Sequence, residues 1–118
     1  GGRGVIVMAL DEGEALAAVE SDLKRLGGEL DRALAAARGQ GIGTEGWSNA
    51  QMALSRYDQA RAPLDAIGAR LVPLARMVDS LPAADADRQA VDALMKRTAA
   101  ASEKAQAQVT AANRALAG

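Results

Sequence analysis

The glycine-rich stretch Gly41-Ile42-Gly43-Thr44-Glu45-Gly46 has the G-x-G-x-x-G spacing that cradles the pyrophosphate of a dinucleotide. That motif works where a strand leads into the glycine turn and the N-terminus of the next helix receives the phosphate. Here a helical pattern precedes the glycines, and Trp47 stands where a phosphate-binding loop has its lysine. We therefore interpret this stretch as a flexible connector between two helices.

Acidic residues cluster at Asp11/Glu12/Glu14 and at Asp85/Asp87. Neither cluster has the alternating oxygen ligands, central glycine and distal glutamate of a calcium loop. Both precede helical patterns, where acids stabilise the first turn, so we predict that they cap helices. The chain has no His and no Cys, which excludes an imidazole base, a thiolate nucleophile and a cysteine zinc site. We expect no enzyme activity, no metal and no cofactor.

Four other side chains are candidates for contact with a partner or ligand: Trp47, Tyr57, Thr98 and Ser102. The two aromatics are expected near one end of the molecule. We favour a structural role for Trp47 there, in which its indole N–H reaches a carbonyl or solvent. Thr98 and Ser102 fall on an inward helical stripe, where they either line a small gap or bond back to the preceding turn.

The composition favours helices as the elements that position these residues. Half of the hydrophobic residues are Ala, and β-branched and aromatic residues are few. Sparse large side chains among abundant Ala suit helices that approach closely. The net charge of −1 over 118 residues lacks the basic excess of a nucleic-acid binder. No apolar run approaches the length of a membrane span.

Three segments show coiled-coil-like, heptad-like spacing of apolar residues, at about 11–38, 48–80 and 82–117. We predict an all-α fold, an antiparallel three-helix bundle with long, Ala-rich helices. Pro63 and Pro73 lie within the second segment, which we expect to be one bent helix, with two helices broken near Pro63 as the alternative. Ser80 is the expected cap of the third segment, with Pro82 in its first turn.

Residues 1–10 are expected to form a flexible or extended arm that precedes a single domain over 11–118. As an alternative, Val5 and Ala9 continue the first apolar stripe into this segment. The sequence begins Gly1-Gly2 without an initiator Met, which fits a trimmed or processed chain. If a signal segment was removed, an exported or cell-envelope location is favoured.

The third segment presents mostly small residues on its inward stripe and so buries little apolar area. We therefore expect a non-catalytic interaction or structural module that binds a protein partner or self-associates. The third segment and the end that bears Trp47 are the expected contact surfaces. The alternative is a carrier of a small apolar ligand or lipid, held in a gap between helices.

Overall fold

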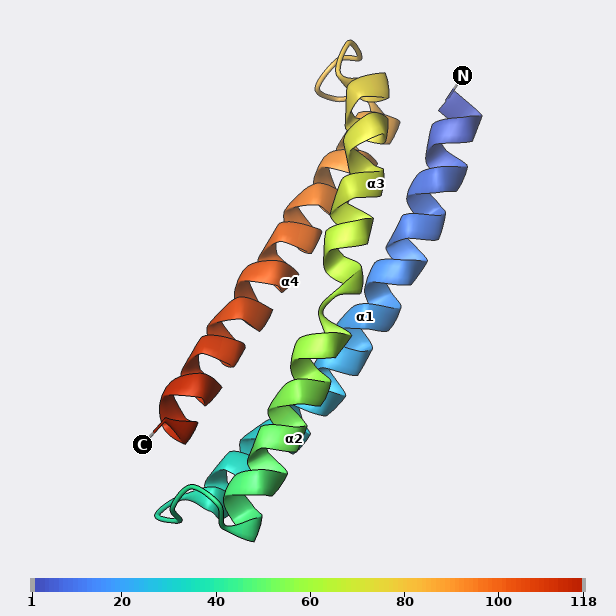
Figure 1. Ribbon diagram of the computed structural model, residues 1–118. Coiled ribbons are helices and arrows are strands. Elements are labelled where there is room, and N and C mark those ends of the chain that lie inside the picture. The colour runs from blue at the N-terminus through green and yellow to red at the C-terminus, as the bar shows by residue number, and fades with distance from the viewer. Residues whose placement is uncertain (1, 118) are drawn as a thin grey trace.

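The computed structural model describes residues 2–117, which form four helices arranged as three rods that lie side by side (Figure 1). They are α1 (Gly2–Ala37), α2 (Glu45–Ala60), α3 (Pro63–Val78) and α4 (Ala86–Leu116). α2 and α3 follow one another along the molecule and together form the middle rod, which runs opposite to α1 and α4. The molecule measures 58 × 19 × 18 Å. The predicted all-α three-helix bundle is confirmed.

The middle rod is interrupted at Arg61 and Ala62, so the prediction of one bent helix over 48–80 is wrong and the two-helix alternative is right. Pro63 has no N–H and cannot donate to the preceding turn. Around it, Ala62 N donates to Gln59 O at 3.3 Å and Leu64 N donates to Arg61 O at 3.0 Å. These bonds span three residues instead of four, which tightens the chain and ends α2. Pro63 then opens α3, where its missing N–H costs nothing.

Pro73 lies inside α3 and does not break it. Its ring faces solvent, while Leu71 and Leu74 beside it are buried. The helix therefore loses the bond to the Ala69 carbonyl on its outer side and keeps its packed face.

The turn between α3 and α4 is longer than predicted. Asp85, not Ser80, caps α4: its Oδ1 accepts from Asp87 N at 2.9 Å and from Arg88 N at 3.1 Å. Pro82 lies in the turn, where its carbonyl accepts from Asp85 N. α4 consequently begins at Ala86 rather than at 82. The predicted helix-capping role of this acidic cluster is confirmed, with Asp85 as the N-cap and Asp87 in the first turn.

α1 begins at Gly2, so residues 2–10 form helix rather than an extended arm. Val5 and Ala9 are buried and continue the inward stripe of α1. Residue 1 lies outside the described residues. The early start places Asp11 and Glu14 in the middle of a helix, so their predicted capping role is wrong.

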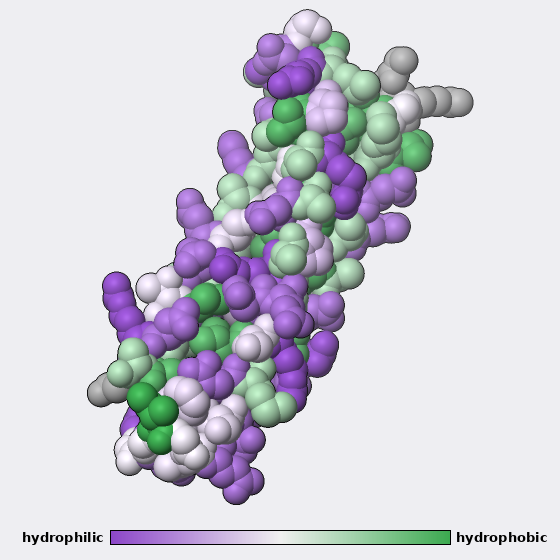
Figure 2. All heavy atoms as spheres, viewed as in Figure 1, coloured by the Kyte–Doolittle hydropathy of each residue, from purple (hydrophilic) through white to green (hydrophobic). Residues whose placement is uncertain are grey.

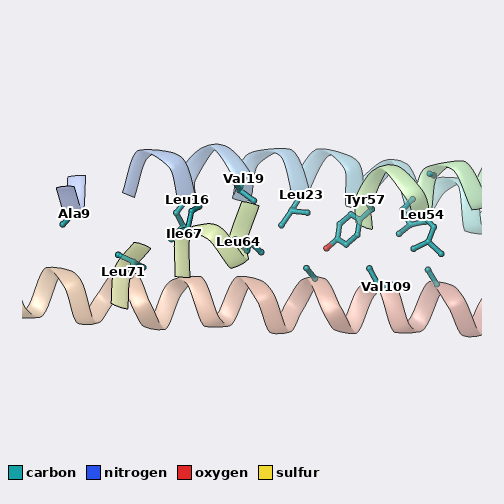
Figure 3. Packing of buried hydrophobic residues seen from close by; sticks show 14 of the residues in the cluster. Ala9, Leu16, Val19, Leu23, Leu54, Tyr57, Leu64, Ile67, Leu71 and Val109 are labelled. Atoms are coloured by element: carbon teal, nitrogen blue, oxygen red, sulfur yellow. The ribbon is translucent and has the colours of Figure 1, made fainter. Parts of the chain in front are cut away.

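The core follows the heptad stripes closely (Figure 3). α1 and the middle rod supply most of its large side chains, and α4 supplies mainly small ones. The buried stripe residues are Leu16, Val19, Leu23, Leu30 and Ala37 of α1; Tyr57, Leu64, Ile67, Leu71, Leu74 and Val78 of the middle rod; and Val91, Thr98, Ala105, Val109, Ala112 and Leu116 of α4. None of the four described helices combines the length and apolar character that crossing a bilayer requires.

Glu12 is a charged residue on the buried stripe of α1. Arg70 Nε of α3 donates to both of its carboxylate oxygens, at 2.6 and 2.7 Å. The Glu12 side chain is 10 % exposed and that of Arg70 is 54 % exposed. The pair therefore neutralises a carboxylate inside the α1–α3 contact and fixes the register of these two helices.

Replacing Pro73 with Ala should raise the free energy of unfolding by about 1–3 kcal/mol, because it restores an interior helical hydrogen bond without touching the core. Urea denaturation measures the change. Pro82→Ala, in the turn, is the matched control and should change stability little. A destabilised Pro73→Ala protein would show instead that the Pro73 backbone geometry is needed for α3 to pack.

Arg70→Ala should lower the free energy of unfolding by about 1–2 kcal/mol, since it leaves the Glu12 carboxylate buried without its partner. The exposure of Arg70 keeps this loss below that of a fully buried pair. Arg25→Ala removes a surface arginine that pairs with Asp22 and Glu29, and should have a much smaller effect. Adding Glu12→Leu to Arg70→Ala should restore stability. Equal losses for the two arginine variants would contradict this account of Glu12.

Candidate functional site

The surface between α1 and α4 is hollowed over the buried ring of Tyr57. This Tyr57 groove has a volume of about 710 Å³. Leu23 and Gly27 of α1, Tyr57 of α2, and Ala101 and Ala105 of α4 form its apolar lining. Because the α4 residues here are alanines, the two helices leave open space between their side chains.

Gly27 allows the Gln108 side chain to approach α1, and the Tyr57 ring packs beside it at an ordinary contact distance. A Cβ at this position would lie 3.4 Å from Tyr57 Cε2 and 3.0 Å from Gln108 Nε2. A glycine pair inside a helix, such as Gly27-Gly28, indicates either a kink or a close contact. Here α1 is unbroken, and the Gln108 side chain makes the close contact at Gly27.

Two polar links join α1 to α4 at the ends of the groove. At one end, Arg97 Nε donates to both carboxylate oxygens of Glu20 at 3.1 Å. The hydrogen bond from Arg97 lowers the pKa of Glu20, although partial burial opposes the shift. At the other end, Gln108 Nε2 donates to the Gly27 carbonyl at 3.2 Å and to Asp31 Oδ1 at 3.3 Å.

Two lysines line the groove between these links, Lys24 on α1 and Lys104 on α4. Within residues 2–117 neither lysine forms a salt bridge. The carboxylates that line the groove, Glu20 and Asp31, already accept hydrogen bonds from α4. Because Lys24, Lys104 and Arg97 face only the carboxylates of Glu20 and Asp31, the lining of the groove carries one net positive charge.

The Tyr57 hydroxyl points into the space between α1 and α4 (Figure 3). Tyr57 is only 2 % exposed, yet its hydroxyl makes no hydrogen bond with another described residue. Every fully enclosed side-chain oxygen or nitrogen in the described part of the chain has a partner. The hydroxyl must therefore be reached from the groove. Burial raises the Tyr57 pKa; Arg61 opposes this rise and Asp31 adds to it.

Trp47 lies at the far end of the bundle, where its Nε1 donates to the Leu116 carbonyl at 3.0 Å. This bond ties the start of α2 to the end of α4, as the structural interpretation of Trp47 predicted. The connector over 38–44 contains Gly39 and Gly43 at positive φ, and it leads directly into the Thr44 cap of α2. A helix precedes this connector, so it lacks the strand on which a dinucleotide site depends.

Thr98 and Ser102 lie on α4 beside α3. The Thr98 hydroxyl donates to the Leu94 carbonyl at 2.7 Å, the back-bonding that was one of its two predicted arrangements. Ser102 is half-buried and borders shallow hollows next to Leu64 and Asp65. The four candidate residues therefore occupy three separate places, and only Tyr57 belongs to the α1–α4 groove.

The sequence did not identify Lys24 and Lys104 as neighbours across a groove. Both lysines lie among charged residues and look like ordinary solvent-facing lysines. Gly27-Gly28 was the one usable signal, because a glycine pair inside a helix indicates a close approach at that point.

As the pH rises past 10, the stability of the folded protein should fall, because Tyr57 ionises more readily in the unfolded chain. Its unfolded pKa is near 10.0 and its folded pKa is higher. The contribution of Tyr57 to the free energy of unfolding is constant below its unfolded pKa and is lost as the pH rises through its folded pKa. Tyr57 is the only tyrosine, so tyrosinate absorbance can be followed in the native and urea-unfolded states. Coincident tyrosinate titration curves for the native and the unfolded protein would contradict a pKa of Tyr57 raised by burial.

In the described part of the chain, no group of three or more Asp, Glu, His or Cys side chains is placed to hold a metal ion. Comparisons of the chain with protein-family models, curated proteins and solved structures give no match. The function must therefore be inferred from the contacts, burial and charge of the described residues.

Proposed function

We propose that this chain is a non-catalytic helical module that works by protein association, in the first instance with a second copy of itself. The observation that carries the proposal is a patch of exposed apolar side chains on the N-terminal turns of α1. Val7, Met8 and Leu10 are 56, 41 and 62 % exposed. We call these three residues the α1 patch.

The N-terminal turns of α1 are apolar on every side. Between Val5 and Leu10 there is no polar residue, and only Val5 and Ala9 are buried within the bundle. A helix segment that is apolar all round is normally covered on all sides. Apolar side chains gather on the surface beside this end of the molecule (Figure 2). This supports an interface there.

α3 extends the apolar surface next to the α1 patch. The Glu12–Arg70 pair sets the antiparallel register, so residues after Arg70 run beside residues before Glu12. Met77 lies in this part of α3 and is 56 % exposed. Together these side chains approach the few hundred Å² that mark interaction sites on soluble proteins.

The distribution of exposed residues favours this end over the third segment as the contact surface. None of the large hydrophobic side chains that are exposed in the described part of the chain belongs to α4. At the Trp47 end, Ile42 is exposed and lines a hollow with Trp47 and Leu116, but no other large hydrophobic side chain in the described part of the connector is exposed. The α1 patch is thus the stronger candidate.

A second copy is a suitable partner for three reasons. The α1 patch carries no charge, and a net charge of −1 gives little repulsion between copies. A two-fold interface lets the same patch face itself. Two patches of a few hundred Å² each fall below the roughly 1,200 Å² of a standard stable interface, in the range of weak and transient contacts. Such a dimer should dissociate on dilution.

Molar mass should be measured by light scattering over a hundredfold range of concentration. We expect the mass to rise from monomer toward dimer, and Leu10→Glu to keep the protein monomeric because it puts a charge into the interface. Met52→Glu is the matched control: Met52 is 55 % exposed but lies on α2, away from the patch, so this variant should behave as wild type. Circular dichroism checks that both variants are folded.

A monomer at every concentration would refute self-association. Loss of the dimer in both variants would show that the α1 patch is not the interface.

A further inference from the structure

We propose that the Tyr57 groove binds a small carboxylic acid with a compact apolar body, such as an aromatic or short-chain carboxylate. This inference goes beyond the proposed association, because the groove and the α1 patch share no residue. It rests on three features of the groove: the hydroxyl of the buried Tyr57, which has no protein partner; two lysines that form no salt bridge; and an apolar lining.

The hydroxyl of Tyr57 indicates a polar ligand atom. A buried tyrosine normally finds a hydrogen-bond partner for its O–H, since leaving the group unsatisfied is costly. Here the residue is only 2 % exposed and its hydroxyl points between α1 and α4. Because the hydroxyl oxygen is not fully enclosed, solvent is the partner that a ligand atom would replace. A neutral phenol is a donor, and a carboxylate oxygen is an acceptor suited to it.

The charges of the groove indicate that this ligand atom is anionic. Glu20 is paired with Arg97, and Asp31 accepts from the neutral amide of Gln108 and keeps its charge. With Lys24 and Lys104 added, the lining of the groove carries one net positive charge. Lys24 and Lys104 stand on opposite walls, one from each helix. Two ammonium groups and one hydroxyl donor can together hold a carboxylate.

The length of the groove selects a compact ligand. Its two polar links reach α1 at Glu20 and at Gly27, seven positions apart, which corresponds to roughly 10 Å along a helix. That length suits one ring or a chain of about six carbons. Leu23, Ala101 and Ala105 offer apolar contacts to such a body. A long fatty acid would extend past the links into solvent.

The other place considered for an apolar ligand lacks these features. Thr98 already uses its hydroxyl on the Leu94 carbonyl, and the hollow beside it is shallow. A purely apolar ligand in the Tyr57 groove would leave the hydroxyl and both lysines without partners. The residues therefore favour an acid over a lipid or hydrocarbon.

Isothermal titration at low ionic strength tests the proposal, with benzoate and hexanoate as probes and benzamide and hexanamide as uncharged counterparts. We expect each acid to bind at least tenfold more tightly than its amide. Tyr57→Phe keeps the ring and should weaken binding about fivefold. The double variant Lys24→Met/Lys104→Met should weaken it about tenfold. Lys96→Met, on α4 but outside the groove, is the matched control and should bind as wild type.

A second readout distinguishes binding at Tyr57 from binding elsewhere. A carboxylate next to the hydroxyl disfavours a second negative charge, so hexanoate should move the tyrosinate titration to higher pH. Absence of acid binding, equal binding of acid and amide, or an unmoved titration would each overturn the proposal. Repeating the titration with Leu10→Glu separates the two inferences, since a monomeric variant should still bind the acid.

Discussion

The burial of the Tyr57 ring against α1 is the constraint on which the α1–α4 side of the bundle depends. α4 brings mainly alanine and other small side chains to the core, so the space between the rods has to be filled from α1 and the middle rod. Tyr57 is the largest of the fully buried side chains and fills that space. Its ring packs against α1 at Gly27, where even an added Cβ would lie 3.4 Å from Tyr57 Cε2, an ordinary contact distance. The same arrangement leaves the floor of the groove lined by a ring on one side and alanines on the other.

Small side chains also explain why polar links join the rods. Alanine stripes bury little area and can slide along one another with little cost, so they specify register weakly. The links Glu12–Arg70, Glu20–Arg97, Gln108–Gly27 and Arg61–Gln106 each join two different rods. Links at the surface contribute little free energy. Their main effect is to select one register among several that the alanines would allow.

The sequence predicted the buried stripes because heptad spacing is local: Leu16, Leu23 and Leu30 face the core whatever the neighbouring helices do. Helix ends were harder to predict, because several neighbouring residues can each cap or extend a helix and only one of them does. Asp85 accepts two backbone N–H groups and caps α4 in place of Ser80. The apolar turns at residues 5–10 extend α1 toward its N-terminus, so the acids at 11–14 lie inside the helix. The groove was beyond prediction, since it needs residues 24, 57 and 104 to meet, and only the register of three rods brings them together.

The α1 patch and the Tyr57 groove lie on one continuous helix, which raises the question of whether they influence each other. A ligand can shift association only if it binds the two association states differently. Between the two surfaces, Glu12 is held by α3 and Glu20 by α4, so α1 is fixed to both neighbouring rods before the groove begins. A carboxylate between Lys24 and Lys104 would strengthen a contact that Arg97 and Gln108 already hold in place. Geometry therefore favours two independent surfaces, the α1 patch proposed for self-association and the Tyr57 groove proposed for a small acid.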